Sequence, residues 1–282
     1  MKRLLAIFAH PDDEGAIAGT LARYAHEGVV VSLVCATKGE AGEISDPSLA
    51  TTENLGSVRE DELRCACAVL GISELHLLDY CDSGMEGTDE NELPTAFINA
   101  DPDEVRGKLV RIIRATKPQV VLTFEPFGWY GHPDHIAAGR YATEAFELAG
   151  NPDAYPEAGD AWLPSHLFHA VLSLSQFKAV VDYAREHGID LNFPDEFPLE
   201  REEKLAAQIT HRLDTQPYQE KKSAATACHR TQFGDDHLFR RVPQDIIWDS
   251  MRYEHFIQVE PPLTPAPTPF DDLYAGLPAE PK

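Results

Sequence analysis

Apolar runs alternate with amphipathic segments along the first half of the chain. Short runs rich in aliphatic and β-branched residues, each bounded by polar residues, predict strands buried on both faces at 4–9, 29–37, 75–78 and 120–124. Between them, apolar residues at helical spacing predict helices at 14–26, 57–70, 104–116 and 134–148. This alternation predicts an α/β fold with a Rossmann-like, mostly parallel sheet flanked by helices.

The pattern is less regular in the second half. A strand is expected at 167–174 and helices at 176–187 and 218–228, with an acidic, Pro-rich surface loop at 151–164. Seven of the 21 prolines follow residue 259, so this tail is expected to be extended or loosely attached. We therefore expect a Rossmann-like catalytic core at 1–175, a C-terminal elaboration that completes the pocket at 176–259, and a Pro-rich tail at 260–282.

The charge balance narrows the class of partner. The 282 residues include 24 Lys and Arg against 47 Asp and Glu, which gives a formal net charge of −23 at pH 7. Nucleic acids and anionic membrane surfaces attract basic proteins, so neither is expected as a partner. No stretch approaches the ~20 apolar residues of a membrane span. A small, neutral or weakly charged substrate is the expected partner.

Cysteine usage and the amino terminus indicate a compartment. The cysteines are odd in number and widely spread in a chain large enough to fold without disulfides, so we expect reduced thiols at Cys35, Cys65, Cys67, Cys81 and Cys228. The apolar run at 4–9 stops short of the ~7–15 residues that an export signal needs. Together these features predict a cytoplasmic protein.

The first concentration of reactive side chains follows the first predicted strand. Residues 9–14 read Ala-His-Pro-Asp-Asp-Glu, between the carboxyl end of that strand and a helix. In open α/β sheets, ligands bind at this edge. Acidic residues at a helix start often only complement the helix dipole. That simpler interpretation does not account for His10 and Pro11 in the same turn, so we interpret the turn as a candidate metal or acid–base site.

A second turn of the same kind follows the fourth predicted strand. Residues 130–135 read Tyr-Gly-His-Pro-Asp-His and lead into another helix. A lone His-Pro-Asp sequence is most often a cap and a turn. However, the carboxyl ends of parallel strands lie at one edge of a sheet, so the two turns can meet in space. Two such turns at equivalent strand ends indicate a metal site.

A ligand count divides these side chains into two groups. A catalytic zinc site keeps three protein ligands and an open position for water, and His10 and Asp13 can share one ion with His135. Asp12 and His132 then remain nearby, where a carboxylate can accept a proton from metal-bound water and a protonated imidazole can stabilise an oxyanion. This arrangement predicts amide or ester hydrolysis. Two histidines and one carboxylate also hold non-haem iron for oxygen chemistry, so the ligands alone leave the reaction open.

At these residues the sequence resembles the PIG-L/LmbE-like metal-dependent N-deacetylases. The signatures of that family are an AHPDDE turn and a downstream HPDH turn, which occur here at 9–14 and 132–135. Within the family, the chain is most similar to the mycothiol-pathway branch, which includes N-acetylglucosaminyl-inositol deacetylase and mycothiol conjugate amidase. Further similar stretches lie at 39–43, 82–89 and 155–159, and the resemblance covers residues 1–175 well and the remainder weakly.

The resemblance implies a Rossmann-like fold and a Zn²⁺ ion, or alternatively Fe²⁺, bound by His10, Asp13 and His135. It implies that Asp12 is the general base and that His132 is the charged group that stabilises the tetrahedral intermediate. These roles match the ones that the ligand count suggests.

Further residues are implied around the pocket. Tyr130 is expected to touch the intermediate or to gate the pocket, although a packed aromatic residue is the simpler interpretation. Arg59 and Asp82 are expected to bind sugar hydroxyls, although an Arg beside acidic residues on a helix is usually a solvated ion pair. His229 resembles part of a late Lys, His and Gln motif of the family and is expected to brace the pocket or to pack.

The resemblance therefore implies a zinc-dependent N-deacetylase that removes the acetyl group from a GlcNAc-inositol-like or related small glycoside by attack of a metal-bound water. Hydrolysis of a mycothiol-type or other larger glucosaminyl amide conjugate is the alternative. The amidase branch carries a Lys just after the first motif, and residues 15–19 here contain no cation. A non-catalytic, sugar-binding metalloprotein and an iron oxygenase are rivals from other classes. The resemblance also suggests a homo-oligomer.

Overall fold

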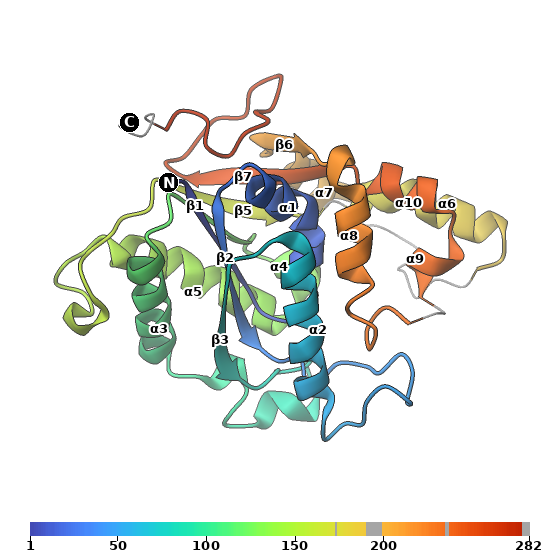
Figure 1. Cartoon of the computed structure of the whole chain (residues 1–282), viewed down its shortest axis with the longest axis horizontal. Coiled ribbons are helices and arrows are strands. Elements are labelled where there is room, and N and C mark those ends of the chain that lie inside the picture. Colours follow the sequence, from blue (N-terminus) through green and yellow to red (C-terminus); the bar gives the residue numbers. More distant parts are fainter. Residues whose placement is uncertain (173, 190–198, 235–236, 278–282) are drawn as a thin grey trace.

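A single mixed sheet organises the chain. The computed structural model describes residues 1–172, 174–189, 199–234 and 237–277, so 190–198 of the expected elaboration and 278–282 of the expected tail lie outside the described residues. The strands follow the order β3-β2-β1-β4-β5-β7-β6 (Figure 1). The first five of these run parallel, whereas β7 pairs antiparallel with both β5 and β6. Their bounds are β1 (Arg3–Phe8), β2 (Val30–Thr37), β3 (Glu74–Tyr80), β4 (Val120–Phe124), β5 (His166–Val171), β6 (His211–Asp214) and β7 (Tyr253–Glu260).

Helices cover both faces of this sheet. On one face α3 and α5 lie against β1 and β4, and on the other α1, α2 and α8 pack together over β2 (Figure 1). No helix in the described ranges has the length and apolar composition needed to cross a bilayer. The helices are α1 (Ala18–His26), α2 (Leu55–Leu70), α3 (Pro102–Thr116), α4 (Gly128–Gly131), α5 (Pro133–Ala149), α6 (Lys178–Glu186), α7 (Leu199–Ala206), α8 (Gln219–Thr226), α9 (Leu238–Arg241) and α10 (Gln244–Ser250).

The predicted elements of the first half all occur. β4 has the expected bounds, and β1 and β2 differ from expectation by one residue at their ends. The helix expected at 14–26 begins as a 3₁₀ turn, Asp13–Ile17, before α1 continues it. The expected Rossmann-like, mostly parallel sheet flanked by helices is confirmed.

The second half supplies two strands that the sequence analysis missed, β6 and β7. In β7 the buried face presents Glu254, Phe256 and Gln258, so burial alternates along the strand while apolarity does not. Hydrophobic alternation, the usual signal of a half-buried strand, is therefore absent from the sequence. Sequence pattern alone does not reveal such a strand.

Glu254 ties β7 to the beginning of α1. Its carboxylate oxygens accept hydrogen bonds from the backbone N–H groups of Gly19 and Thr20, at 3.0 and 2.7 Å. One of these oxygens also lies 2.7 Å from Nζ of Lys222 in α8. A carboxylate at a helix N-terminus satisfies free N–H groups and complements the helix dipole. The C-terminal half thus holds in place the helix that follows the first motif.

The tail, expected to be extended or loosely attached, is described as far as residue 277, and this part is anchored to the domain. Beyond β7, residues 261–277 form turns and extended chain. The hydroxyl of Tyr24 in α1 donates to the Asp272 carboxylate at 2.9 Å and accepts from the backbone N–H of Leu273 at 2.7 Å. Leu273 is fully buried in the main core, so this segment packs on the domain.

One disulfide corrects the expectation of five reduced thiols. Cys65 in α2 is bonded to Cys228, which follows α8, and the two residues lie 163 positions apart in the sequence. The other three cysteines, Cys35, Cys67 and Cys81, are free. The expectation is wrong for this pair because chain size makes a disulfide unnecessary for folding but does not prevent two facing helices from forming one.

Removal of this disulfide should destabilise the fold. We expect Cys65→Ser to lower the free energy of unfolding by about 2–4 kcal/mol, because the crosslink restricts the unfolded chain. Urea denaturation without reductant measures the change. The control is Cys81→Ser at a free, half-buried thiol, with an expected change of roughly 0.5 kcal/mol or less. Equal stability of the two variants would contradict the crosslink.

Candidate active site

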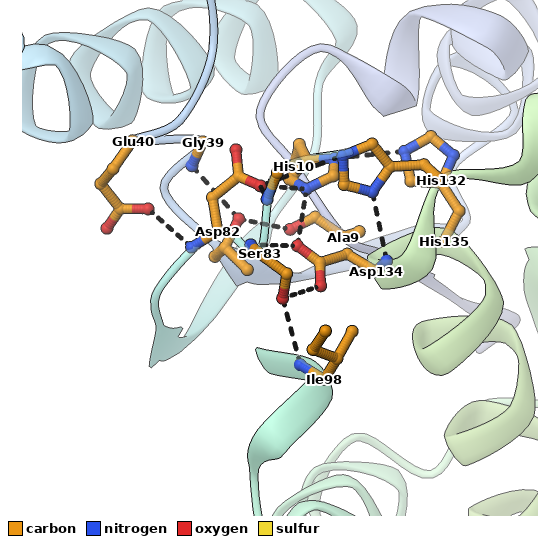
Figure 2. A network of polar contacts seen from close by, with 12 residues as sticks. Ala9, His10, Gly39, Glu40, Asp82, Ser83, Ile98, His132, Asp134 and His135 are labelled. Atoms are coloured by element: carbon orange, nitrogen blue, oxygen red, sulfur yellow. Dashed lines mark hydrogen bonds and ion pairs between the residues drawn. The ribbon is translucent and has the colours of Figure 1, made fainter. Parts of the chain in front are cut away.

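The two histidine-containing turns meet at the carboxyl edge of the sheet. β1 pairs directly with β4, so the turns that follow these strands are neighbours. Nδ1 of His10 lies 3.1 Å from Nε2 of His135. Figure 2 shows the imidazoles of His10, His132 and His135 grouped together, with the carboxylate of Asp82 beside His10 and that of Asp134 below it. Adjacent parallel strands thus bring together residues that are far apart in the sequence.

Asp13 is fixed by the backbone of its own turn. One carboxylate oxygen, Oδ2, accepts hydrogen bonds from the backbone N–H groups of His10 at 2.7 Å and Ala9 at 3.2 Å. The other, Oδ1, lies 3.1 Å from Nε2 of His135. Burial raises the pKa of Asp13, but the nearby His135 and His10 outweigh it and lower the pKa to about 2. Asp13 is therefore an ionised carboxylate that faces the imidazoles.

The orientation of His135 depends on a close backbone approach. Its Nδ1 lies 3.3 Å from the carbonyl oxygen of Gly128, and its ring stacks on Phe124 with the centroids 4.2 Å apart. Gly128 has φ of 65°, and a Cβ at this position would lie 2.6 Å from the Cβ of His135. Only glycine fits there. With Nδ1 directed at a carbonyl, Nε2 is the nitrogen that presents a lone pair toward Asp13 and His10.

His10 faces polar groups on both sides of its ring. While Nδ1 faces His135, Nε2 lies 3.1 Å from the Asp134 carboxylate and 3.4 Å from that of Asp82. Burial lowers the pKa of His10, but Asp134 and Asp82 outweigh this effect and raise the pKa well above its usual value. The surrounding carboxylates thus favour a positive charge at this point of the structure.

These donors fit a divalent cation. A tetrahedral ion with donor bonds of ~2.0–2.2 Å spaces its ligands about 3.3 Å apart. Nε2 of His135 lies 3.1 Å from Nδ1 of His10 and from Oδ1 of Asp13, and Nδ1 of His10 lies 3.7 Å from Oδ2 of Asp13. All three side chains are buried. Each imidazole turns its other nitrogen toward a protein oxygen, which leaves lone pairs to converge on the space between them. That convergence is what a cation requires.

Two groups of possible ligands, each of three residues, occur among the described residues; both contain His10, and neither contains Asp13. One consists of His10, His132 and His135, and the other of His10, Asp82 and Asp134, each with its donor atoms within 4.8 Å of one another. The second group lies on the Nε2 side of His10. In metal sites a carboxylate commonly accepts the second N–H of a ligating histidine, and Asp134 is placed for that role.

Asp12 lies next to this centre in an unusual conformation. Its backbone φ is 97°, in the left-handed region that residues other than glycine rarely adopt. Its carboxylate lies 3.1 Å from Nη2 of Arg59. Burial raises the pKa of Asp12 to about 6, even though Arg59 acts in the opposite direction. A carboxylate with such a pKa is suited to proton transfer near neutral pH.

His132 caps α5, and this fixes which of its nitrogens faces the pocket. Nδ1 accepts the backbone N–H of Asp134 at 3.1 Å, so in the neutral ring Nε2 carries the proton. Nε2 lies 4.0 Å from the Asp82 carboxylate. Burial, together with His10 and His135, lowers the pKa of His132 to about 4. The structure thus favours a neutral imidazole that donates from Nε2, in place of the charged group expected from the sequence.

Arg59 is turned into the protein. The side chain is buried, and it donates to the carbonyl oxygens of Gly39 at 2.7 Å and Pro11 at 2.6 Å, as well as to Asp12. The simpler interpretation as a solvated ion pair is therefore wrong. These contacts link α2 to the first motif and direct the guanidinium toward Asp12.

Tyr130 is exposed at the edge of the site, whereas Asp82 is buried within it. Tyr130 lies in α4 and is 53% exposed, with its ring centroid 5.0 Å from that of His135. Asp82 is buried, and its Oδ1 accepts the backbone N–H of Gly84 at 2.9 Å. Burial raises the pKa of Asp82, but His10 outweighs it and holds that pKa well below its usual range.

Asp134 and Glu14, which had no assigned role in the sequence analysis, also build the site, together with His229, which was expected to brace the pocket or to pack. Asp134, fully buried, accepts hydrogen bonds from the backbone N–H and the hydroxyl of Ser83 at 2.9 and 2.5 Å. The position of Asp134 within the HPDH turn could have identified it as a site residue from the sequence. Glu14 and His229 form a buried contact of 2.6 Å between opposite ends of the chain, and no spacing in the sequence indicates that pairing.

The arrangement defines a class of protein, an α/β fold with a buried group of His and Asp residues that could hold a metal ion at the carboxyl edge of its sheet. Residues 5–146 match the family model of PIG-L, described as GlcNAc-PI de-N-acetylase. The chain belongs to the PIG-L family, as the motifs predicted. Two relatives bear the name 1D-myo-inositol 2-acetamido-2-deoxy-alpha-D-glucopyranoside deacetylase. The one from Geodermatophilus obscurus is 35% identical over 98% of each chain, and the one from Thermobispora bispora is 40% identical over 82% of this chain and 79% of its own.

Solved structures share the fold at lower identity. N,N'-diacetylchitobiose deacetylase from Pyrococcus horikoshii has a TM-score of 0.64 at 23% identity, over 91% of this chain and 83% of its own. The 4-carboxy-2-hydroxymuconate hydratase from Pseudomonas putida KT2440 has a TM-score of 0.63 at 20% identity, over 95% of this chain and 100% of its own. These likenesses concern the fold alone, and a fold shared by a deacetylase and a hydratase does not select a reaction.

The contact between Asp134 and His10 should tune metal affinity. We expect Asp134→Asn to weaken Zn²⁺ binding about 10- to 100-fold, because the substitution removes the carboxylate that orients His10. Competition with a chromophoric chelator measures the dissociation constant. The control is Asp101→Asn, at an aspartate that caps α3 away from the site. An Asp134→Asn affinity within twofold of that control would contradict the proposed orientation.

Proposed function

We propose that this chain is a zinc-dependent N-deacetylase that hydrolyses the acetamido group of a GlcNAc-inositol or a closely related small glucosaminide. The observation that carries this proposal is that Nε2 of His135 lies within 3.1 Å of both Nδ1 of His10 and Oδ1 of Asp13, and that the carboxylate of the preceding residue, Asp12, interacts electrostatically with that of Asp13. The names of the full-length relatives support the reaction and the substrate class. The same donors suit Fe²⁺, so zinc is the proposed ion and iron its alternative.

The proposed ligands are His10, Asp13 and His135. A divalent cation supplies Lewis-acid polarisation of the acetamido carbonyl and lowers the pKa of water. The three side chains contribute two neutral imidazoles and one carboxylate, a set that leaves a net positive charge at the site. The buried surroundings of these residues strengthen the attraction between that charge and a polarised carbonyl oxygen.

Asp12 is the proposed general base. With a pKa of about 6, its carboxylate is mostly ionised at neutral pH and can accept a proton from the attacking water. Arg59 donates to the Asp12 carboxylate at 3.1 Å and so orients it. As the C–N bond of the acetamido group breaks, the proton held on Asp12 passes to the glucosamine nitrogen, and acetate is the other product. We propose that Arg59 acts through Asp12, in place of the sugar contact that the resemblance implied.

His132 and Tyr130 are proposed to stabilise the tetrahedral intermediate. Because Nδ1 of His132 accepts a backbone N–H, Nε2 is the donor available to the developing oxyanion. Tyr130, half exposed at the edge of the site, can donate its phenol hydroxyl to the same oxygen or close over the substrate. Asp82, an ionised carboxylate beside His10 and His132, is proposed to accept a hydrogen bond from a sugar hydroxyl.

Two further expectations concern the protein in the cell. A homo-oligomer and a cytoplasmic location stay predictions. The disulfide between Cys65 and Cys228 belongs to a class of bond that persists mainly in oxidising compartments. Thiol alkylation of the protein directly after cell lysis decides whether this bond is present where the protein resides.

Amine release from a panel of glucosaminides tests the proposed reaction. The panel contains N-acetylglucosamine, N-acetylglucosaminyl-inositol, N-acetylglucosaminyl-malate and diacetylchitobiose. We expect release from N-acetylglucosaminyl-inositol, loss of this activity after chelation, and recovery on addition of Zn²⁺ or Fe²⁺ under anaerobic conditions. If the metal-loaded protein releases no amine from any compound of the panel, the proposed substrate class is wrong, and larger amide conjugates are favoured as substrates. A requirement for oxygen would contradict hydrolysis.

The role of Asp12 is tested by an isosteric substitution. We expect Asp12→Asn to lower kcat by about 10²–10⁴-fold, because the amide cannot accept the proton of the attacking water. Metal content, measured by atomic absorption, should remain that of the unaltered chain. Asp61→Asn, at an exposed position of α2, serves as the control and should retain kcat. Loss of metal from Asp12→Asn would instead identify Asp12 as a ligand.

A further inference from the structure

A buried ion pair lies directly behind the proposed base. Nε2 of His229 is 2.6 Å from Oε1 of Glu14, and both side chains are 1% exposed. The second oxygen of Glu14, Oε2, accepts the backbone N–H of Asp12 at 3.0 Å. Glu14 therefore links His229, from the C-terminal half, to the main chain of the residue proposed to move the proton.

The backbone of Asp12 needs such an external support. Its φ of 97° and ψ of −20° place a residue with a Cβ in the left-handed region, which persists only where the surroundings enforce it. The N–H of Asp12 donates to the Glu14 carboxylate, and the carbonyl oxygen of Asp12 accepts the N–H of Gly15 at 2.9 Å. Loss of the Glu14 contact would free the N–H and allow the backbone to relax.

Glu14 in turn depends on the imidazole of His229. A carboxylate that is 1% exposed is costly to bury unless it is paired and hydrogen-bonded. His229 supplies that pairing, and although burial lowers its pKa, the Glu14 carboxylate outweighs burial and raises it. The other nitrogen, Nδ1 of His229, is buried and has no hydrogen-bond partner among the described residues. The imidazole is thus held in place mainly through Glu14.

The segment that carries His229 is clamped to α2. We call residues 228–231 the strap. At one end Cys228 is bonded to Cys65 of α2. At the other, the backbone N–H and hydroxyl of Thr231 donate to the carboxylate of Glu62, also in α2, at 2.8 and 2.6 Å. His229 lies between these two attachments.

The same helix reaches Asp12 from the other side. Arg59 of α2 donates to the Asp12 carboxylate and to the preceding carbonyl oxygen, that of Pro11. The contacts therefore form a closed ring from Asp12 through Glu14, His229 and α2 back to Asp12. A ring of this kind fixes both the main chain and the carboxylate of one residue.

We propose that His229 is a positioning residue, which acts through Glu14 to hold Asp12 in its left-handed conformation and so aims the base. The inference rests on the proposed function for the role of Asp12, and extends it to a residue more than two hundred positions away in the sequence. The hydrogen bond of the His229 side chain is to Glu14 and not to a proposed metal ligand.

Two variants of His229 test the proposal by steady-state kinetics. His229→Asn cannot reach Glu14, so we expect kcat to fall about 100-fold, as for a misplacement of about 1 Å, with unchanged KM and metal content. His229→Gln restores a donor of similar reach and should recover most of that loss. The control is His211→Gln, at an equally buried imidazole that lies beside Phe168 and takes no part in the ring of contacts around Asp12. The control should lose thermal stability while retaining kcat.

Other outcomes overturn the proposal. If His229→Asn is less stable but keeps its kcat, the residue is only structural. If the metal content of His229→Asn falls in proportion to kcat, the pair of Glu14 and His229 supports the metal ligands and not Asp12. Should His229→Asn fail to fold, Glu14→Asp tests the same contact from its other side, because the shorter carboxylate cannot reach both His229 and the N–H of Asp12. We again expect a reduced kcat at unchanged KM. An unchanged kcat contradicts the proposal.

A crystal structure of the variant separates this inference from the proposed function. If the unaltered chain releases no amine from any substrate, the proposed reaction fails, but the conformation of Asp12 is still measurable. In His229→Asn we expect φ of Asp12 to leave the left-handed region, whereas in His211→Gln it should stay there. An unchanged φ and carboxylate position in His229→Asn would overturn the positioning role.

Discussion

The site depends on the contacts of the His10 imidazole, because this ring joins the two motifs. Its two nitrogens face different partners. On one side Nδ1 faces His135, and on the other Nε2 faces Asp134. A ring held from both sides has little freedom to rotate, so the donor set is prepared before a ligand arrives. The surrounding carboxylates make the same place attractive to positive charge. The rest of the fold serves to hold this ring between its partners.

The sheet achieves that by an ordinary property of parallel strands. β1 and β4 are neighbours, and their carboxyl ends deliver the two motifs to one point. The second half of the chain then completes the surroundings. Glu254 of β7 fixes the start of α1, and the strap reaches Glu14 from behind. Residues from the C-terminal half therefore determine the position of groups in the first motif, although they contribute none of the proposed ligands.

Sequence reasoning reached the fold and the two motifs because both have local signals. Buried parallel strands read as apolar runs, and the histidine and aspartate residues of each turn are contiguous. The remainder depends on contacts between distant segments. β7 was missed because its buried face includes Glu254 and Gln258, and the disulfide was missed because no spacing relates Cys65 to Cys228. The inward orientation of Arg59 follows from the carbonyl oxygens of Gly39 and Pro11, which only the folded chain brings together.

The position of the metal itself tests this account most directly. A crystal of the Zn²⁺-loaded chain, with anomalous data collected on both sides of the zinc absorption edge, locates the ion without reference to activity. We expect a peak enclosed by Nδ1 of His10, Oδ1 of Asp13 and Nε2 of His135, with Asp12 beside it and not bonded. A peak on the opposite side of the ring, among Nε2 of His10, Asp82 and Asp134, would contradict this expectation.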